Sequence, residues 1–143
     1  MIDNNSCQCY LLLMLDIQVI DDPQAATVAL AELRDRGCEA GGYRLAGAHL
    51  DHVCARHLYG DDRMLTAWLA EDHAVVVAVG RHDQSSGDVY TLLLGALGLE
   101  VPDDEREKPP CCDEAGQPPA DSAVAADIAD ALERLGRARR RAR

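Results

Sequence analysis

The run AVVVAVG at residues 74–80 places the tightest limit on what this chain can fold into. Seven apolar residues, most of them valine, stand between the turn-forming EDH at 71–73 and the polar loop RHDQSSG at 81–87. An apolar run this short is typical of a strand, and a strand without polar alternation needs cover on both faces. We therefore expect a central strand in a sheet that is packed on each side.

The flanking segments predict the rest of a small sheet with helices. Residues 9–20 (CYLLLMLDIQVI) indicate a buried first strand, and residues 21–37 a helix that Asp21 or Asp22 caps and Gly37 ends, with Ala26, Leu30 and Leu33 on one face. Residues 52–59 and 63–70 alternate as two strands joined by the GDD turn at 60–62, and residues 43–45 suit a further short strand. Residues 88–99 predict a helix with the apolar stripe Val89, Leu92, Leu93 and Ala96.

These elements define an α+β fold with a thin core. Phe is absent and Trp occurs once, so small aliphatic side chains must fill the interior of one sheet backed by helices. We expect a small antiparallel sheet, an N-terminal strand plus a three-strand meander, in a domain of residues 1–99. Residues 100–120 form an acidic, proline-rich linker, and residues 121–143 an amphipathic helix with a basic tail, capped by Asp121 or Ser122 and carrying the stripe Val124, Ile128, Ala131 and Leu135.

Charge and the absence of sorting signals set the expected environment. The net charge of −11 weakens a nucleic-acid-binding interpretation for the whole chain, because such proteins usually carry a basic surface. The apolar run YLLLML (10–15) is too short to span a bilayer, and no targeting segment is recognisable, so we expect no membrane contact and a cytoplasmic location. The six cysteines are then expected to be free thiols, since the cytosol keeps them reduced.

Residues 43–90, from YRLAG to VY, resemble the C-terminal half of RelE/ParE-type toxins from bacterial toxin–antitoxin pairs. That half has an arginine-bearing strand, a short turn, an arginine that opens the next strand, an apolar strand ending in VG with His or Arg, and a closing VY. The matching features here are Arg56, the turn at 60–62, Arg63, Val79, Gly80, Arg81, His82, Val89 and Tyr90. The resemblance implies a RelE/ParE-like sheet.

The RelE branch cleaves mRNA, often on the ribosome, without a metal or other cofactor: a 2′-hydroxyl attacks the adjacent phosphate. Such a reaction needs fixed cations for the phosphate and groups that move protons. By this resemblance Arg63 and Arg81 hold the phosphate, and His82 and Tyr90 are the acid and base. Arg44 and Arg56 would bind RNA, and the partners would be mRNA, the ribosome and a cognate antitoxin.

Two other classes of function stay open. The ParE branch targets a protein rather than RNA, and the net acidity of this chain favours such a non-catalytic binding role. A thiol- or metal-binding module is the third hypothesis, with Cys7, Cys9, Cys111 and Cys112 as zinc ligands, although neither pair has the spacing of a common zinc knuckle.

The candidate residues also have purely structural interpretations. Arg63 would pair with Asp61 or Asp62 at the hairpin turn, His82 would cap a loop, and Tyr90 would rest on the sheet. Their meeting at one strand exit favours a site, because loops at strand ends commonly carry function. The nuclease hypothesis requires that the sheet bring these guanidinium, imidazole and phenol groups to the same side.

Overall fold

The computed structural model describes residues 8–11, 23–45, 52–82, 88–98 and 109–141. Five strands form one sheet in the order β1-β5-β4-β3-β2, with β1 parallel to β5 and the other neighbours antiparallel. The strands are β1 (Gln8–Leu11), β2 (Tyr43–Arg44), β3 (Val53–His57), β4 (Asp62–Ala70) and β5 (His73–Arg81). The valine-rich run forms β5, which lies inside the sheet between β1 and β4, and the N-terminal strand lies beside the meander β3-β4-β5.

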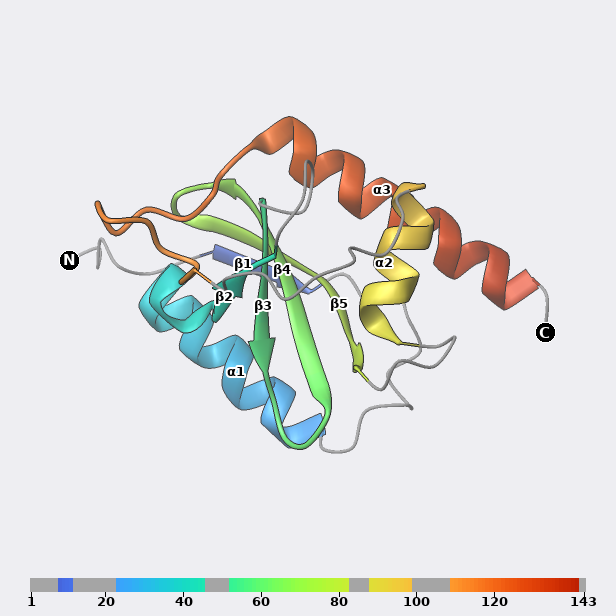
Figure 1. Cartoon of the computed structure of the whole chain (residues 1–143), viewed down its shortest axis with the longest axis horizontal. Helices are drawn as coiled ribbons and strands as arrows, with labels where there is room; N and C mark the ends of the chain where they lie inside the picture. The colour runs from blue at the N-terminus through green and yellow to red at the C-terminus, as the bar shows by residue number, and fades with distance from the viewer. Residues whose placement is uncertain (1–7, 12–22, 46–51, 83–87, 99–108, 142–143) are drawn as a thin grey trace.

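Helices cover both faces of the sheet, which confirms the α+β class (Figure 1). The helices are α1 (Pro23–Arg36), the short 3₁₀ helix η2 (Gly37–Ala40), α2 (Val89–Leu97) and α3 (Ser122–Arg141). Asp121 caps α3, because its Oδ1 accepts the backbone N–H of Val124 at 3.1 Å. The predicted caps Asp21 and Asp22 of α1 lie outside the described residues. Within the described part of the chain, no helix combines the length and apolar character needed to cross a membrane.

Each face of the sheet has its own apolar core. On the α1 face, Ala29 and Leu33 pack with Trp68, and Ala26 and Leu30 border them, so the predicted stripe of this helix is confirmed. On the α2 face, which α2 shares with α3, the buried residues come from three strands and both helices; they include Val53, Leu65, Val77, Leu93 and Ile128. The C-terminal helix is therefore part of the domain core.

A β-bulge in β5 decides which face its last residues occupy. Leu65 pairs with Ala78 whereas Thr66 pairs with Val76, so Val77 is the extra residue. Val77 and Ala78 consequently both join the α2-face core, and the alternation of β5 reverses beyond this point. Val79 lies in the α1-face core, which an uninterrupted alternation from Val77 would not allow.

Residues 109–121, here called the C-terminal strap, run from the β2 edge to the start of α3. Arg44 donates its backbone N–H to Pro109, Cys111 donates its own to Gly42, and Tyr43 and Pro110 form an isolated bridge. At its far end Asp121 donates to the carbonyl of Trp68 at 2.9 Å. The strap therefore covers the free edge of the two-residue strand β2.

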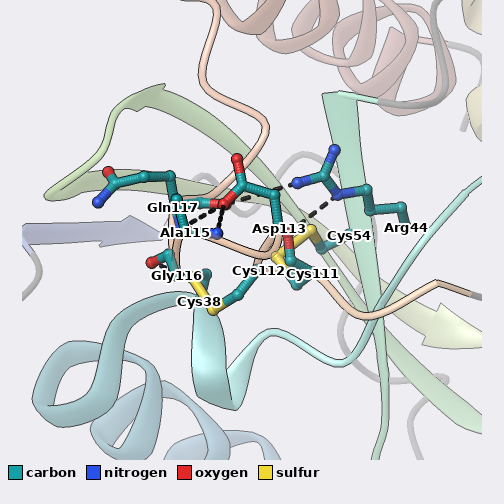
Figure 2. Close-up of a disulfide and its surroundings, with 9 residues drawn as sticks. All are labelled: Cys38, Arg44, Cys54, Cys111, Cys112, Asp113, Ala115, Gly116 and Gln117. Atoms are coloured by element: carbon teal, nitrogen blue, oxygen red, sulfur yellow. Dashed lines mark hydrogen bonds between the residues drawn. A yellow bond between two sulfur atoms is a disulfide. The ribbon is translucent and has the colours of Figure 1, made fainter.

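Two disulfides fasten this strap, so the expectation of free thiols is wrong for four of the six cysteines. Cys112 is bonded to Cys38 of η2 and Cys111 to Cys54 of β3 (Figure 2). Cys111 is fully buried rather than exposed. The bridged residues are 74 and 57 positions apart, so chain entropy alone gives each bridge about 4 kcal/mol of stabilisation, largely shared because the loops overlap.

The packing of α3 makes a stability prediction. Ile128 is 1% exposed in the α2-face core, so Ile128→Ala leaves a cavity and lowers the free energy of unfolding by about 3 kcal/mol in urea titrations. The neighbouring exposed Asp127 is the control, because Asp127→Ala shifts that free energy by less than about 0.5 kcal/mol. Equal effects of the two substitutions would show that α3 does not contribute to the core.

Candidate functional site

Three strand positions lie side by side where β3, β4 and β5 meet the hairpin end of the sheet. His57 is opposite Arg63, and Arg63 is opposite Gly80. Directly paired residues on neighbouring strands project to the same face. That face is the α2 face, because a Cβ on Gly80 would lie 3.4 Å from Cβ of Val89 in α2. Arg63 thus sits between an imidazole and the start of a helix.

Asp88 joins this helix to the strand exit. It is the N-cap of α2: its Oδ1 accepts the backbone N–H groups of Tyr90 at 2.8 Å and Thr91 at 3.2 Å. Its second oxygen lies 2.7 Å from Nδ1 of His82. The carboxylate side chain is 2% exposed and the imidazole 37% exposed. A buried, fixed carboxylate therefore orients an accessible histidine.

Three further aromatic side chains continue from this histidine across the α2 face. The ring of His82 meets Tyr90 edge-on at 4.4 Å, and the Tyr90 hydroxyl lies 2.7 Å from that of Tyr43. The ring of Tyr43 in turn meets His57 at 5.8 Å. We call His82, Tyr90, Tyr43 and His57 the imidazole–phenol row. It links α2 and the strand exits through side chains that can donate or accept protons.

The phenol of Tyr90 is held in its protonated form. Burial, followed by the hydrogen bond and charge interaction with Tyr43, raises the pKa of Tyr90 well above the ordinary value of a phenol, and Asp88 adds to this rise. The positive charge of Arg63 opposes this rise in the pKa. At neutral pH Tyr90 is therefore a hydrogen-bond donor and not a base.

Arg63 places a positive charge on this face. The residue is 9% exposed, and its Nη1 donates to the carbonyls of Asp62 at 3.0 Å and Gly60 at 3.4 Å. Its buried Nε has no hydrogen-bond partner among the described residues. A buried N–H without a partner is costly, and the charge of this nearly buried guanidinium is screened little by solvent.

The sheet separates the other predicted arginines from this cluster. Arg81 is opposite Asp62, one position along from the Arg63–Gly80 pair, and so belongs to the α1 face. Arg56 bonds Glu32 of α1 at 2.9 Å and the carbonyl of Ala40. Of the six predicted site residues, the structure brings together Arg63, His82 and Tyr90; Arg81 and Arg56 do not join Arg63 in holding one phosphate.

Arg44 has a structural role on the α1 face. Its Nε donates to the carbonyl of Cys111 at 3.0 Å, and its Nη2 lies 3.5 Å from that of Gln117, as Figure 2 shows. These bonds hold the guanidinium against the C-terminal strap. The predicted RNA contact of Arg44 would compete with them.

Three members of the cluster were missed from sequence. Asp88 precedes a predicted helix, and an aspartate there signals an N-cap that a nearby histidine can share. His57 alternates with Val53 and Ala55, which places it on the core side of β3. Tyr43 had no comparable signal, because its position depends on pairing between β2 and Ala55 across a connection.

The described residues offer no ligand set for the zinc hypothesis. Cys111 and Cys112 are in disulfides and offer no thiolates, and Cys7 lies outside the described residues. Among the residues that the structure describes, no three His, Cys, Asp or Glu side chains are grouped so as to hold a metal ion.

Comparison with protein-family models, characterised proteins and solved structures found no match to this chain.

The row predicts a measurable effect of Tyr43 on Tyr90. Tyr43→Phe removes the hydroxyl whose hydrogen bond and charge raise the pKa of Tyr90, so this pKa falls towards the ordinary value of a phenol. A pH titration followed by NMR of labelled tyrosine rings measures this shift. Tyr59, which is 67% exposed, supplies the control: Tyr59→Phe leaves the Tyr90 titration unchanged, and an unchanged titration in Tyr43→Phe would contradict the hydrogen bond.

Proposed function

We propose that this protein is a metal-independent endoribonuclease of the RelE type, which cleaves mRNA by attack of a 2′-hydroxyl on the adjacent phosphate. The observation that carries the proposal is the 2.7 Å contact between Nδ1 of His82 and the buried carboxylate of Asp88. The arrangement of an N-terminal strand beside a three-strand meander, which the resemblance implies, also supports it.

His82 is suited to be the general base. The bond to Asp88 fixes its ring and engages Nδ1, which leaves Nε2 for the substrate on a ring that solvent reaches. Nε2 takes the proton of the 2′-hydroxyl as this oxygen forms a bond to phosphorus. Asp88 then stabilises the imidazolium, because the two charges are opposite and adjacent.

Arg63 and Tyr90 complete the reaction on the same face. The positive charge of Arg63 on this face stabilises the charge on the pentacoordinate phosphate. As the bond from phosphorus to the 5′-oxygen breaks, Tyr90 gives its proton to the leaving oxygen. The positive charge of Arg63, which lowers the pKa of Tyr90, stabilises the resulting phenolate. The products are a 2′,3′-cyclic phosphate and a 5′-hydroxyl, and solvent restores both protonation states.

An RNA-cleavage assay tests this function. Purified protein is incubated with end-labelled mRNA, with and without ribosomes, in EDTA. We expect cyclic-phosphate ends and a rate that falls by about 10²-fold or more in His82→Ala, because a general base commonly contributes that factor. Arg81→Ala is the matched control from the opposite face and retains the rate.

Two results contradict the nuclease proposal. One is intact RNA under all of these conditions. The other is cleavage that His82→Ala does not slow, or that proceeds equally on a substrate whose 2′-hydroxyl is replaced by hydrogen.

Two substitutions at Asp88 separate its structural and positioning roles. Asn is as good an N-cap as Asp, so Asp88→Asn changes the free energy of unfolding by less than about 1 kcal/mol, whereas Asp88→Ala lowers it by about 1–2 kcal/mol. Both remove the negative charge beside His82, so both slow cleavage by about tenfold or more. Urea titration and the RNA assay measure the two effects, and full activity in Asp88→Asn would exclude the positioning role.

A non-catalytic binding role is the second candidate. The net charge of −11 and the engagement of Arg44 and Arg56 within the chain favour a basic protein partner over RNA. Such a protein leaves RNA intact, and its binding to a basic partner weakens as salt rises. A cognate antitoxin would be a further partner of either form.

The cytoplasmic location is also a proposal. Disulfides in the cytosol are usually transient and serve catalysis or redox sensing. The two disulfides of this chain would therefore form only part of the time if the protein is cytoplasmic. A cytoplasmic form of this chain would therefore alternate between bridged and reduced states.

A further inference from the structure

We propose that the paired disulfides form a redox latch: while bridged they hold the C-terminal strap on β2 and keep Tyr43 in the imidazole–phenol row, and their reduction releases both. The latch concerns the conformation of β2 and does not require the nuclease activity. Only its effect on RNA cleavage rests on the proposed function.

The covalent arrangement concentrates both bridges at one point of the strap. Cys111 and Cys112 are adjacent, yet one is bonded to β3 through Cys54 and the other to η2 through Cys38 (Figure 2). A dipeptide thus joins two separate elements to the same short segment. The sulfur of Cys111 also fills the space beside Gly41, where a Cβ would lie 2.7 Å away.

The strand held by this strap has little support of its own. β2 is two residues long and pairs with β3 through Tyr43 and Arg44. On its other edge it depends on the strap, through the 2.8 Å bond from the Arg44 amide to Pro109 and the 2.9 Å bond from the Cys111 amide to Gly42. Without the strap, one two-residue ladder would have to hold Tyr43 in place.

Tyr43 connects the position of β2 to the α2 face of the sheet. Arg44 projects to the α1 face with Cys54, and Tyr43 projects to the α2 face, where its hydroxyl meets that of Tyr90 at 2.7 Å. Movement of β2 therefore removes a hydrogen bond from Tyr90, which itself contacts His82 at 4.4 Å. The two sides of the sheet are coupled through one short strand.

The reductant in this proposal is a dithiol. Its thiolate attacks the sulfur of Cys112, which is half-buried, and the Cys38 sulfur leaves as a thiolate and takes up a proton. The second thiol of the reagent then closes a cyclic disulfide and releases Cys112. Cys54 and Cys111 are fully buried, so their bridge opens second by the same two-electron exchange.

Hydrogen exchange in the full chain, with dithiothreitol as the dithiol, tests the latch. On reduction we expect the amides of Arg44 and Cys111 to exchange at least about tenfold faster, while amides of β4 and β5 keep their rates, because local opening leaves the central ladder intact. The ring titration of Tyr90 should shift down on reduction in the native sequence and show no such shift in Tyr43→Phe.

A double variant separates the two bridges. Cys38→Ser combined with Cys112→Ser keeps the inner bridge, so the Arg44 and Cys111 amides stay protected until dithiothreitol is added. Three outcomes overturn the latch. The first is that the Arg44 and Cys111 amides exchange at the same rate after reduction as before it, even if the four released thiols bind zinc. The second is an equal increase in exchange rate throughout the sheet, and the third is fast exchange of these two amides in the double variant before reduction.

The RNA assay is read separately. If neither redox form cleaves RNA, the proposed function fails while the exchange data still decide the latch. If both forms cleave RNA at the same rate although β2 opens, the latch stands and its effect on catalysis is excluded.

Discussion

The extra residue in β5 is the constraint on which the candidate site depends. Up to Val77, odd-numbered residues of this strand face α2; from Ala78 onward the even-numbered ones do. Unbroken alternation would place Arg81 on the same face as Arg63 and turn His82 towards α1. One inserted residue exchanges the two, so the α2 face holds an imidazole where a second guanidinium was expected.

That exchange changes the chemistry of the site. Two arginines without a base would suit anion binding, whereas one arginine with a carboxylate-oriented histidine suits proton transfer next to an anion. In the second arrangement Asp88 has two roles, because the same carboxylate caps the start of α2 and orients His82. The start of the helix and the orientation of the imidazole are therefore linked.

The sequence predicted what depends on local pattern. The valine strand follows from a short, continuous apolar run, and the α1 stripe and the amphipathic C-terminal helix follow from apolar periodicity; each packs as expected. The bulge was not predicted because AVVVAVG is apolar on both faces, so no polar residue marks a change of register. The disulfides were not predicted because cysteines are expected to be reduced in the cytoplasm. In addition, no local pattern indicates that Cys54 and Cys111 meet across 57 residues.

Pro109 and Pro110 give the strap a role in solubility. Both lack an N–H group, so they occupy the rim of the sheet without offering another chain a regular ladder to extend. Loss of this segment would uncover a β2 backbone able to pair with the same strand of another copy. Truncation before the strap would therefore favour self-association of an otherwise highly charged, mutually repelling protein.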